Sequence, residues 1–356
     1  MRFISLGKID KTLIVILIGC VICFLNRFLN QVNCQLHKTP VLNNICISIS
    51  RFITVIPFII YKLRNKRLFV TNNQIEKTNT NDIKYIYNDM EKQKVKGKWR
   101  LIILTGMLHI IEQTCFVYSF KIKTNCWITF ILFASIFYYL IFKVKLYKHH
   151  YLSILIIISI GLTIDLVVEN LQNEITSSPF NLLAKYMKEI LFSLFNVLAK
   201  YIMEKKFVTV YEFSFYDGFI NLVAFVVFAI LDYKYINLND YDTFFNNFNN
   251  TELLVIFCVI FTQLGINLTT LFSTKNNTPC HLFIIFVFGN MAYYVNFKGY
   301  APLIIACLII ILFLSLIFNE IIEVNVFGLS YNTKKNIMER ASSELLEKTD
   351  SYDEEV

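Results

Sequence analysis

The sequence predicts an all-α membrane protein with ten transmembrane helices. Of its 356 residues, 56% are apolar and 17% are charged, whereas about a quarter of the residues in soluble domains are charged. The mean hydropathy is +0.53. Several apolar runs reach the roughly 18 to 20 residues that a helix needs to cross the hydrocarbon layer. These observations exclude a soluble fold and favour one membrane domain.

Five spans are expected in the first half of the chain. The first, 11–31, is expected to be retained, because no small-residue cleavage site follows its apolar stretch. In the second, 44–61, Pro57 is expected to bend the helix. The polar segment 62–98 then predicts a solvated cytosolic loop. Three further apolar runs follow that loop: 99–120, 125–142 and 150–169.

Five more spans are expected in the second half. The sixth carries the most polar side chains of the ten. The expected bounds are 181–203, 210–231, 252–272, 279–297 and 300–318. The remaining segment, 321–356, ends in the acidic sequence SSELLEKTDSYDEEV. We expect it to form a cytosolic tail that is largely disordered.

The distribution of Lys and Arg supports this count. With the N-terminus in the cytosol, 24 of the 34 basic residues fall on the cytosolic side, five on the other side and five within spans. Cytosolic loops of membrane proteins carry such an excess of positive charge. Both termini are therefore predicted to be cytosolic.

Three stretches resemble a known family of transporters. The first is FASIFYYLIFKVKLYKHHYLSILIIISIGLTI, residues 133–164. The others are LFSLFNVLAKYIMEKKFVTVYEFSFYDGFI, 191–220, and FNEIIEVNVFGLSYNTKKNIMERA, 318–341. They resemble the drug/metabolite transporter superfamily, in particular the eukaryotic solute carrier 35 F-type branch, whose relatives include nucleotide-sugar transporters. The segment 126–134 departs from that branch, because it lacks the expected Gln and Arg-Gly pair.

The resemblance implies a fold and a function. The fold would be two inverted five-helix repeats, 1–172 and 173–320, around a central cavity, a common basis for alternating access. The function would be transport of a small polar or anionic organic solute across a lipid bilayer. The resemblance also favours an endomembrane location (Golgi, ER, or vacuole or lysosome) over the plasma membrane. Whether the chain forms a homodimer is left open.

Polar and ionisable side chains within spans are costly in lipid, so they are the candidate substrate-binding residues. Arg51 cannot lose its charge and needs an anion, which we expect to be Glu112, Glu189 or a substrate group. His109 and Glu112 share a helix face, which suits either proton exchange with a solute or a structural hydrogen bond. The full set of candidates is Arg51, His109, Glu112, Glu189, Asn196, Lys200, Gln263, Asn267 and Asn290.

The sixth span contributes three of these candidates. Glu189, Asn196 and Lys200 recur with Ser193 at spacings of four, three and four residues, which is one helix face. They could line a transport pathway. Alternatively, Lys200 extends to the membrane surface and Glu189 pairs with Lys185. In the second half, Gln263 and Asn267 are i,i+4 neighbours, and Asn290 follows a glycine.

Catalysis and metal binding are not expected, and neither is binding to nucleic acid. His149 and His150 are adjacent, so on a helix their side chains should point about 100° apart rather than form an i,i+4 metal pair. The five histidines are too few and too dispersed for a membrane di-iron site, and no hydrolase or nucleotide-binding motif is present. The nine cysteines form no disulfide framework. The alternatives to a transporter are a non-transporting scaffold or receptor and, least favoured, a membrane enzyme; no cofactor is implied.

Overall fold

The computed structural model describes residues 4–6, 11–32, 39–64, 97–119, 126–172, 179–236, 241–246, 249–294, 301–324, 333 and 336. Within these ranges the protein is helical except for one short ribbon of two strands. Strand β1 (Ile4–Leu6) pairs antiparallel with β2 (Ile322–Val324), with Ser5 opposite Glu323. Most of the expected loop 62–98 and of the expected tail 321–356 lies outside the described residues.

The long helices coincide with the expected spans. In the first half they are α1 (Lys11–Val32), α2 (Pro40–Phe52), α5 (Lys98–Ser119), α6 (Phe130–Phe142) and α7 (Lys148–Gln172). In the second half they are α8 (Pro179–Lys205), α9 (Val210–Leu231), α11 (Asn250–Asn276), α12 (Leu282–Tyr294) and α13 (Ala301–Phe318). Short helical segments precede or join them: η3 (Cys126–Thr129), η4 (Asp232–Ile236), α10 (Tyr241–Asn246) and η5 (Pro279–His281).

Five helical stretches among the described residues are long and apolar enough to cross a membrane. They are Pro40–Arg64, Lys98–Ser119, Val210–Ile236, Asn250–Asn276 and Ala301–Phe318. Shorter apolar helices cover Ile14–Asn26, Trp127–Phe142, Lys148–Ile164 and Pro279–Met291. Helix α8 has 27 residues but also carries several charged side chains. The helical class expected from the sequence is therefore confirmed.

The α5 helix shows that the protein has the polarity expected in lipid. Its outer face exposes Leu104, Met107 and Ile111 by 55 to 57%. Its inner face buries His109 and Glu112, each about 1% exposed. A soluble protein has the opposite pattern, and it rarely exposes large contiguous apolar surfaces. The exposure pattern of α5 is thus compatible with an integral membrane protein.

The second span is interrupted, as Pro57 led us to expect. Helix α2 ends at Phe52, a turn occupies Ile53 and Thr54, and helix resumes over 55–64. Proline has no N–H to donate to the carbonyl four residues earlier, and its ring clashes with that carbonyl, here that of Ile53. The Thr54 hydroxyl donates to the Arg51 carbonyl at 2.6 Å. The break therefore lies next to Arg51.

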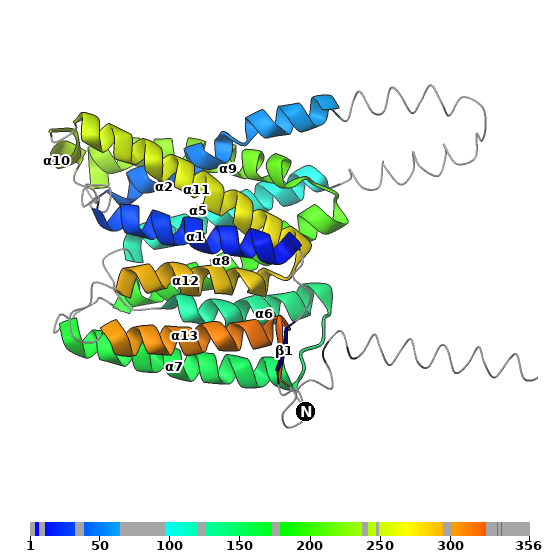
Figure 1. The fold of residues 1–356 in the computed structure, drawn as a ribbon. Coiled ribbons are helices and arrows are strands. Elements are labelled where there is room, and N and C mark those ends of the chain that lie inside the picture. Colours follow the sequence, from blue (N-terminus) through cyan, green and yellow to red (C-terminus); the bar gives the residue numbers. More distant parts are fainter. Residues whose placement is uncertain are drawn as a thin grey trace, which may run out of the picture.

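Helices of the two halves pack mainly against each other. Helix α5 contacts α8 and α9, α2 contacts α9 and α11, and α1 contacts α11 and α12. Helix α6 packs on α8, α7 on α13, and α12 on α13. Figure 1 shows α6, α7, α12 and α13 in the lower part of the molecule and α2, α9 and α11 in the upper part. The largest apolar core lies among α1, α6, α7, α12 and α13, and a second joins α5, α8, α9 and α11.

Candidate functional site

Buried charged and polar side chains meet where α2, α5, α8 and α9 pack together. Helices α2 and α5 belong to the first half of the chain, and α8 and α9 to the second. We call this group the central cluster. Its members are Arg51, His109, Glu112, Gln113, Lys188, Glu189, Asp217 and Asn221. All except Gln113 and Lys188 are at most 9% exposed.

Arg51 links α2 to both α5 and α9. Its guanidinium forms an ion pair with the Asp217 carboxylate, and the same Nη1 lies 3.0 Å from Nε2 of His109. The guanidinium carbon also lies 5.7 Å from the centre of the Phe195 ring on α8. A buried guanidinium needs such compensation, because it keeps its charge.

A close helix crossing brings this ion pair together. A Cβ atom added to Gly218 would lie 2.6 Å from the Phe52 backbone nitrogen and 2.7 Å from Cβ of Arg51. Only a residue without a side chain lets α9 approach α2 this closely. Gly218 directly follows Asp217, so the same crossing holds the carboxylate against Arg51.

His109 is held from both ring nitrogens. Its Nδ1 lies 3.0 Å from Oδ1 of Asp217, but also 2.8 Å from Nη1 of Arg51 and 2.9 Å from Nδ2 of Asn221. Its Nε2 lies within 3.0 Å of Arg51 Nη1 and 3.3 Å of Gln113 Nε2. Since these nitrogens of Arg51, Gln113 and Asn221 can only donate, at least one of the two ring nitrogens has to accept, as in a neutral imidazole. The ring also stacks on Phe195, with centroids 4.4 Å apart.

Glu112 lies beside this histidine, within the electrostatic reach of Lys188 and Arg51. Its Oε2 accepts a hydrogen bond of 2.6 Å from Gln113 and lies 3.6 Å from Nε2 of His109. On α8, Lys188 pairs with Glu189 at 2.9 Å. Glu112 is close enough to both to feel their charges. The cluster therefore contains two internally balanced ion pairs and one further carboxyl group.

A second, uncharged polar group lies on the other side of α2. Asn267 of α11 donates to the Ser50 hydroxyl at 2.8 Å, and Thr262 of α11 donates to Asn26 of α1 at 2.8 Å. Ser50 directly precedes Arg51. The interrupted helix α2 is thus flanked by charged side chains towards α5 and α9 and by neutral ones towards α11.

Some of the predicted site residues lie together in the structure. Arg51, His109, Glu112 and Glu189 lie in the central cluster, and Asn267 approaches it through Ser50. The other predicted residues do not join it. Asn196 and Asn290 donate to carbonyls of their own helices at 2.8 Å, Lys200 of α8 donates to carbonyls at the end of α11, and Gln263 is half-buried on α11.

The protein anion that pairs with Arg51 is not one of the two expected. The anion that Arg51 contacts is Asp217, not Glu112 or Glu189, because the Gly218 crossing brings α9 rather than α5 or α8 nearest to its guanidinium. Glu189 pairs with Lys188, and its pairing with Lys185, the alternative to a pathway role, stays a prediction. The sequence did hold a signal for Asp217, because an aspartate deep in an apolar span needs a cationic partner.

Lys200 binds backbone carbonyls, whereas lining a transport pathway was one of the roles expected for it. Its ammonium donates to the carbonyls of Thr274 and Lys275 at 3.2 and 3.3 Å and to that of Asn277 at 2.5 Å. These carbonyls lie at the C-terminal end of α11, where backbone acceptors lack helical partners and the helix dipole is negative. Lys200 therefore caps α11 from the neighbouring helix α8.

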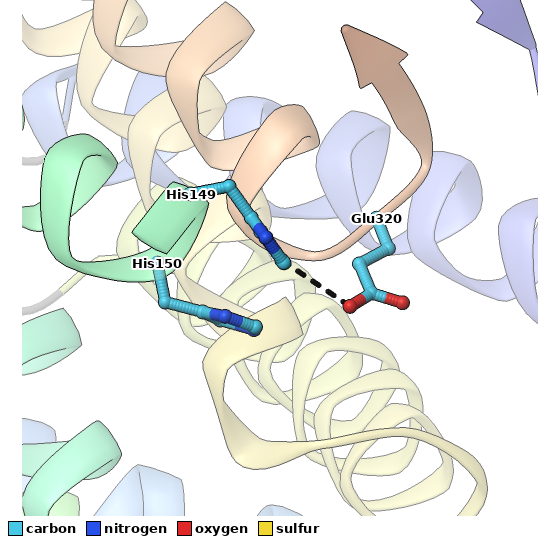
Figure 2. A group of neighbouring side chains, drawn as sticks. All are labelled: His149, His150 and Glu320. Carbon is cyan, nitrogen blue, oxygen red and sulfur yellow. Dashed lines mark ion pairs between the residues drawn. The ribbon is translucent and has the colours of Figure 1, made fainter. Parts of the chain in front are cut away.

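A third polar group, drawn in Figure 2, lies where the start of α7 meets the residues that follow α13: His149, His150 and Glu320. The expectation that the two adjacent imidazoles point apart is wrong. Their ring centroids lie 4.0 Å apart at the start of α7, and Nε2 of His149 lies 3.2 Å from the Glu320 carboxylate. Glu320 has φ of 57° and ends α13 in the conformation that glycine usually provides.

These three residues bring one possible metal-ligating atom each to within 4.8 Å of the others. The hydrogen bonds disfavour such use of His150. Its Nδ1 accepts from the Tyr147 backbone N–H at 3.1 Å, so in a neutral ring Nε2 carries the hydrogen. A metal bound to His150 would have to displace that bond. The geometry instead suits a contact that holds the beginning of α7 against the end of α13.

The central cluster is thus the largest buried polar site of the described residues, and it draws on both halves of the chain. Arg51 and Asp217 lie where α2 and α9 cross, and His109 and Glu112 extend the site to α5 and α8. No protein-family model and no curated protein matches this sequence.

Proposed function

We propose that the chain is a multi-pass membrane transporter of the drug/metabolite type that moves a small polar or anionic organic solute by alternating access. The observation that carries this proposal is the central cluster. Groups such as Arg51, Glu112 and Asp217 are costly inside an apolar helical protein, and they typically mark pathways for substrates or ions. The resemblance of the sequence to that superfamily points the same way.

The helix packing supports two related halves. The two halves can be compared by matching their helices in order: α1 with α8, α2 with α9, α5 with α11, α6 with α12 and α7 with α13. The α5–α8 contact then becomes the α1–α11 contact, α6–α8 becomes α1–α12, and α5–α9 becomes α2–α11. The α2–α9 and α7–α13 contacts map onto themselves. Because five crossings reverse the direction of a chain, two such repeats would be inverted, with α2 and α9 crossing at their shared axis.

The interrupted helix α2 supports a binding site at this axis. Substrate sites of secondary transporters are often built where a membrane helix is broken and its backbone groups are freed. Here the break at Ile53 and Thr54 lies directly after Arg51. A carboxylate or phosphate of a solute could exchange with Asp217 for the guanidinium, which can bind such groups through two parallel hydrogen bonds.

The direct test is counterflow in liposomes reconstituted with the purified chain. Nucleotide sugars, amino acids, nucleosides and phosphorylated sugars would be screened one class at a time. We expect exchange of one anionic or polar class, and at least a tenfold loss with Arg51→Gln. The matched control is Arg64→Gln, an exposed arginine of the same span, which should transport normally. Folded protein that exchanges none of these solutes would contradict the proposal.

A non-transporting scaffold or receptor is the second candidate. It is favoured by the pairing of Arg51 with Asp217 and of Lys188 with Glu189, which leaves these charges satisfied without any solute. In that case Arg51→Gln would destabilise the fold, and no solute would protect the protein against heat. For either function we propose that both termini face the cytosol and that the protein resides in an endomembrane.

A further inference from the structure

We infer that the transporter proposed above is coupled to protons and that the His109–Glu112 pair is the proton-binding site. This inference rests on the proposed function and adds the identity of the coupling ion. It is carried by the arrangement of charges around Glu112, a side chain that is about 1% exposed.

The first step is the charge balance of the central cluster. Arg51 is neutralised by Asp217, and Lys188 is neutralised by Glu189. The cluster thus holds three carboxyl groups and two permanent cations, and Lys188, which is paired with Glu189, also attracts Glu112. A buried ionised carboxylate without a counter-charge is strongly disfavoured, so a proton is the simplest group that makes the whole cluster neutral.

The second step is the state of His109. Its Nδ1 lies 3.0 Å from Asp217 but also 2.8 Å from Arg51 Nη1 and 2.9 Å from Asn221 Nδ2, and its Nε2 faces Arg51 and Gln113 at 3.0 and 3.3 Å. Because these nitrogens of Arg51, Asn221 and Gln113 can only donate, at least one ring nitrogen has to accept, which favours a neutral imidazole and leaves Glu112 as the holder of the proton. Glu112 Oε2 is 3.6 Å from His109 Nε2. A small shift would let the proton pass from the carboxyl oxygen to the imidazole, giving a carboxylate beside an imidazolium.

The third step is the link to the solute site. His109 contacts both members of the Arg51–Asp217 ion pair. When Glu112 releases its proton, the cluster gains one negative charge, and Arg51 is drawn towards Glu112 as well as Asp217. When Glu112 takes up a proton, Arg51 is freed for an anionic solute. Binding of an anion to Arg51 and of a proton to Glu112 therefore favour each other, which is the requirement for their movement in the same direction.

The other groups around Glu112 do not replace it as the proton carrier. Gln113 and Cys115 lie on the same helix, and Gln113 does not titrate. Lys188 and Glu189 face it from α8 and balance each other. From α2 and α9, Arg51 and Asp217 face the pair and also balance each other. Glu112 with His109 is thus the unit of the cluster whose charge can change by one.

The proton site can be tested without knowledge of the solute. In wild-type protein we expect an infrared carbonyl band from a protonated carboxylic acid that shifts in D₂O. Glu112→Gln should remove this band, and Asp242→Asn, which changes an exposed acid of α10, should leave it unchanged. If Glu112→Gln fails to fold, loss of the wild-type band as the pH is raised, and its retention in Glu112→Asp, provide the same information. A wild-type spectrum without the band would overturn the inference.

Coupling is tested with the solute that shows counterflow. Uptake would be compared with and without an inward proton gradient. We expect the gradient to raise wild-type uptake severalfold, and the ratio to fall to about one in Glu112→Gln and to recover in Glu112→Asp. Wild-type counterflow with a ratio of one would overturn the inference while leaving the transporter proposal intact. Absence of counterflow for every solute would overturn the transporter proposal itself.

Discussion

At the scale of single residues, the pairing of Arg51 with Asp217 determines what the central cluster can do. Both side chains are buried, and the guanidinium cannot become neutral. Removing one member of a buried ion pair is much more damaging than losing a surface pair, because the other charge remains in an apolar environment. Substitution of either member of this pair should therefore lower the stability of the protein as well as its transport activity.

Asp217→Asn should lower the free energy of unfolding by about 3–5 kcal/mol, since it leaves the buried Arg51 without an anion. Thermal unfolding of the purified protein in detergent would measure this as a lower Tm. Asp242→Asn is the matched control, because Asp242 is exposed on α10, and its Tm should not change. Equal Tm values for the two variants would show that Arg51 does not depend on Asp217.

Individual residues were also where the sequence was least informative. A polar side chain is conspicuous in an apolar span, so Arg51, His109, Glu112 and Glu189 could be predicted as site residues from the sequence. Their partners could not, because pairing depends on which helices cross and at what height. Asn196 and Asn290 illustrate the limit, because each donates its side-chain amide to a carbonyl of its own helix. The sequence alone does not distinguish such an asparagine from one that is available to bind a solute.

At the scale of helices, small residues set the distances on which the site depends. Gly218 brings the α9 backbone against the α2 backbone at Arg51 and Phe52. Gly106 on α5 instead faces the end of the Ile220 side chain, with Cδ1 2.9 Å from an added Cβ. A side-chain tip can rotate away, whereas backbone atoms can separate only if the helices move apart.

Gly218→Ala should therefore be more damaging than Gly106→Ala, although each adds one methyl group. We expect Gly218→Ala to destabilise the protein by about 1–3 kcal/mol, the usual cost of overpacking, and to reduce transport by separating Arg51 from Asp217. Gly106→Ala should cost less and retain transport. Tm and counterflow measured for both variants would check this, and a reversed order would contradict the close crossing of α2 and α9.

The positions of the helices were largely predictable from apolar runs, because lipid imposes a length and a polarity on each run. The break in α2 was predictable from Pro57. The contact of α7 with α13 through His149 and Glu320 was not predictable, since the two residues are far apart in sequence and their meeting depends on the left-handed backbone of Glu320.

At the scale of the whole molecule, the exposure of side chains is compatible with a lipid environment. Apolar residues such as Leu254 and Phe261 on α11 are 64% exposed, while the charged groups of the central cluster lie inside. The proposed ten crossings place the α6–α7 turn on the cytosolic side and α10 on the opposite side. In Figure 1 these two segments lie at opposite ends of the molecule.

Cysteine labelling can check this arrangement. Lys145→Cys in the α6–α7 turn and Asp242→Cys in α10 both introduce an exposed thiol. In sealed vesicles of known orientation, a membrane-impermeant maleimide should label only one of the two until the vesicles are permeabilised. The protein without an added cysteine gives the background. Labelling of both positions from the same side would exclude the proposed topology.

The short ribbon of β1 and β2 has a consequence for the path of the chain. Backbone hydrogen bonds hold Ser5 opposite Glu323, so the segment before the first long helix and the segment after the last one lie on the same side of any bilayer. A chain that returns to its starting side has traversed the barrier an even number of times. For the proposed membrane protein we therefore expect an even total, in which at least one of the shorter or more charged helices joins the five stretches that are long and apolar enough to cross.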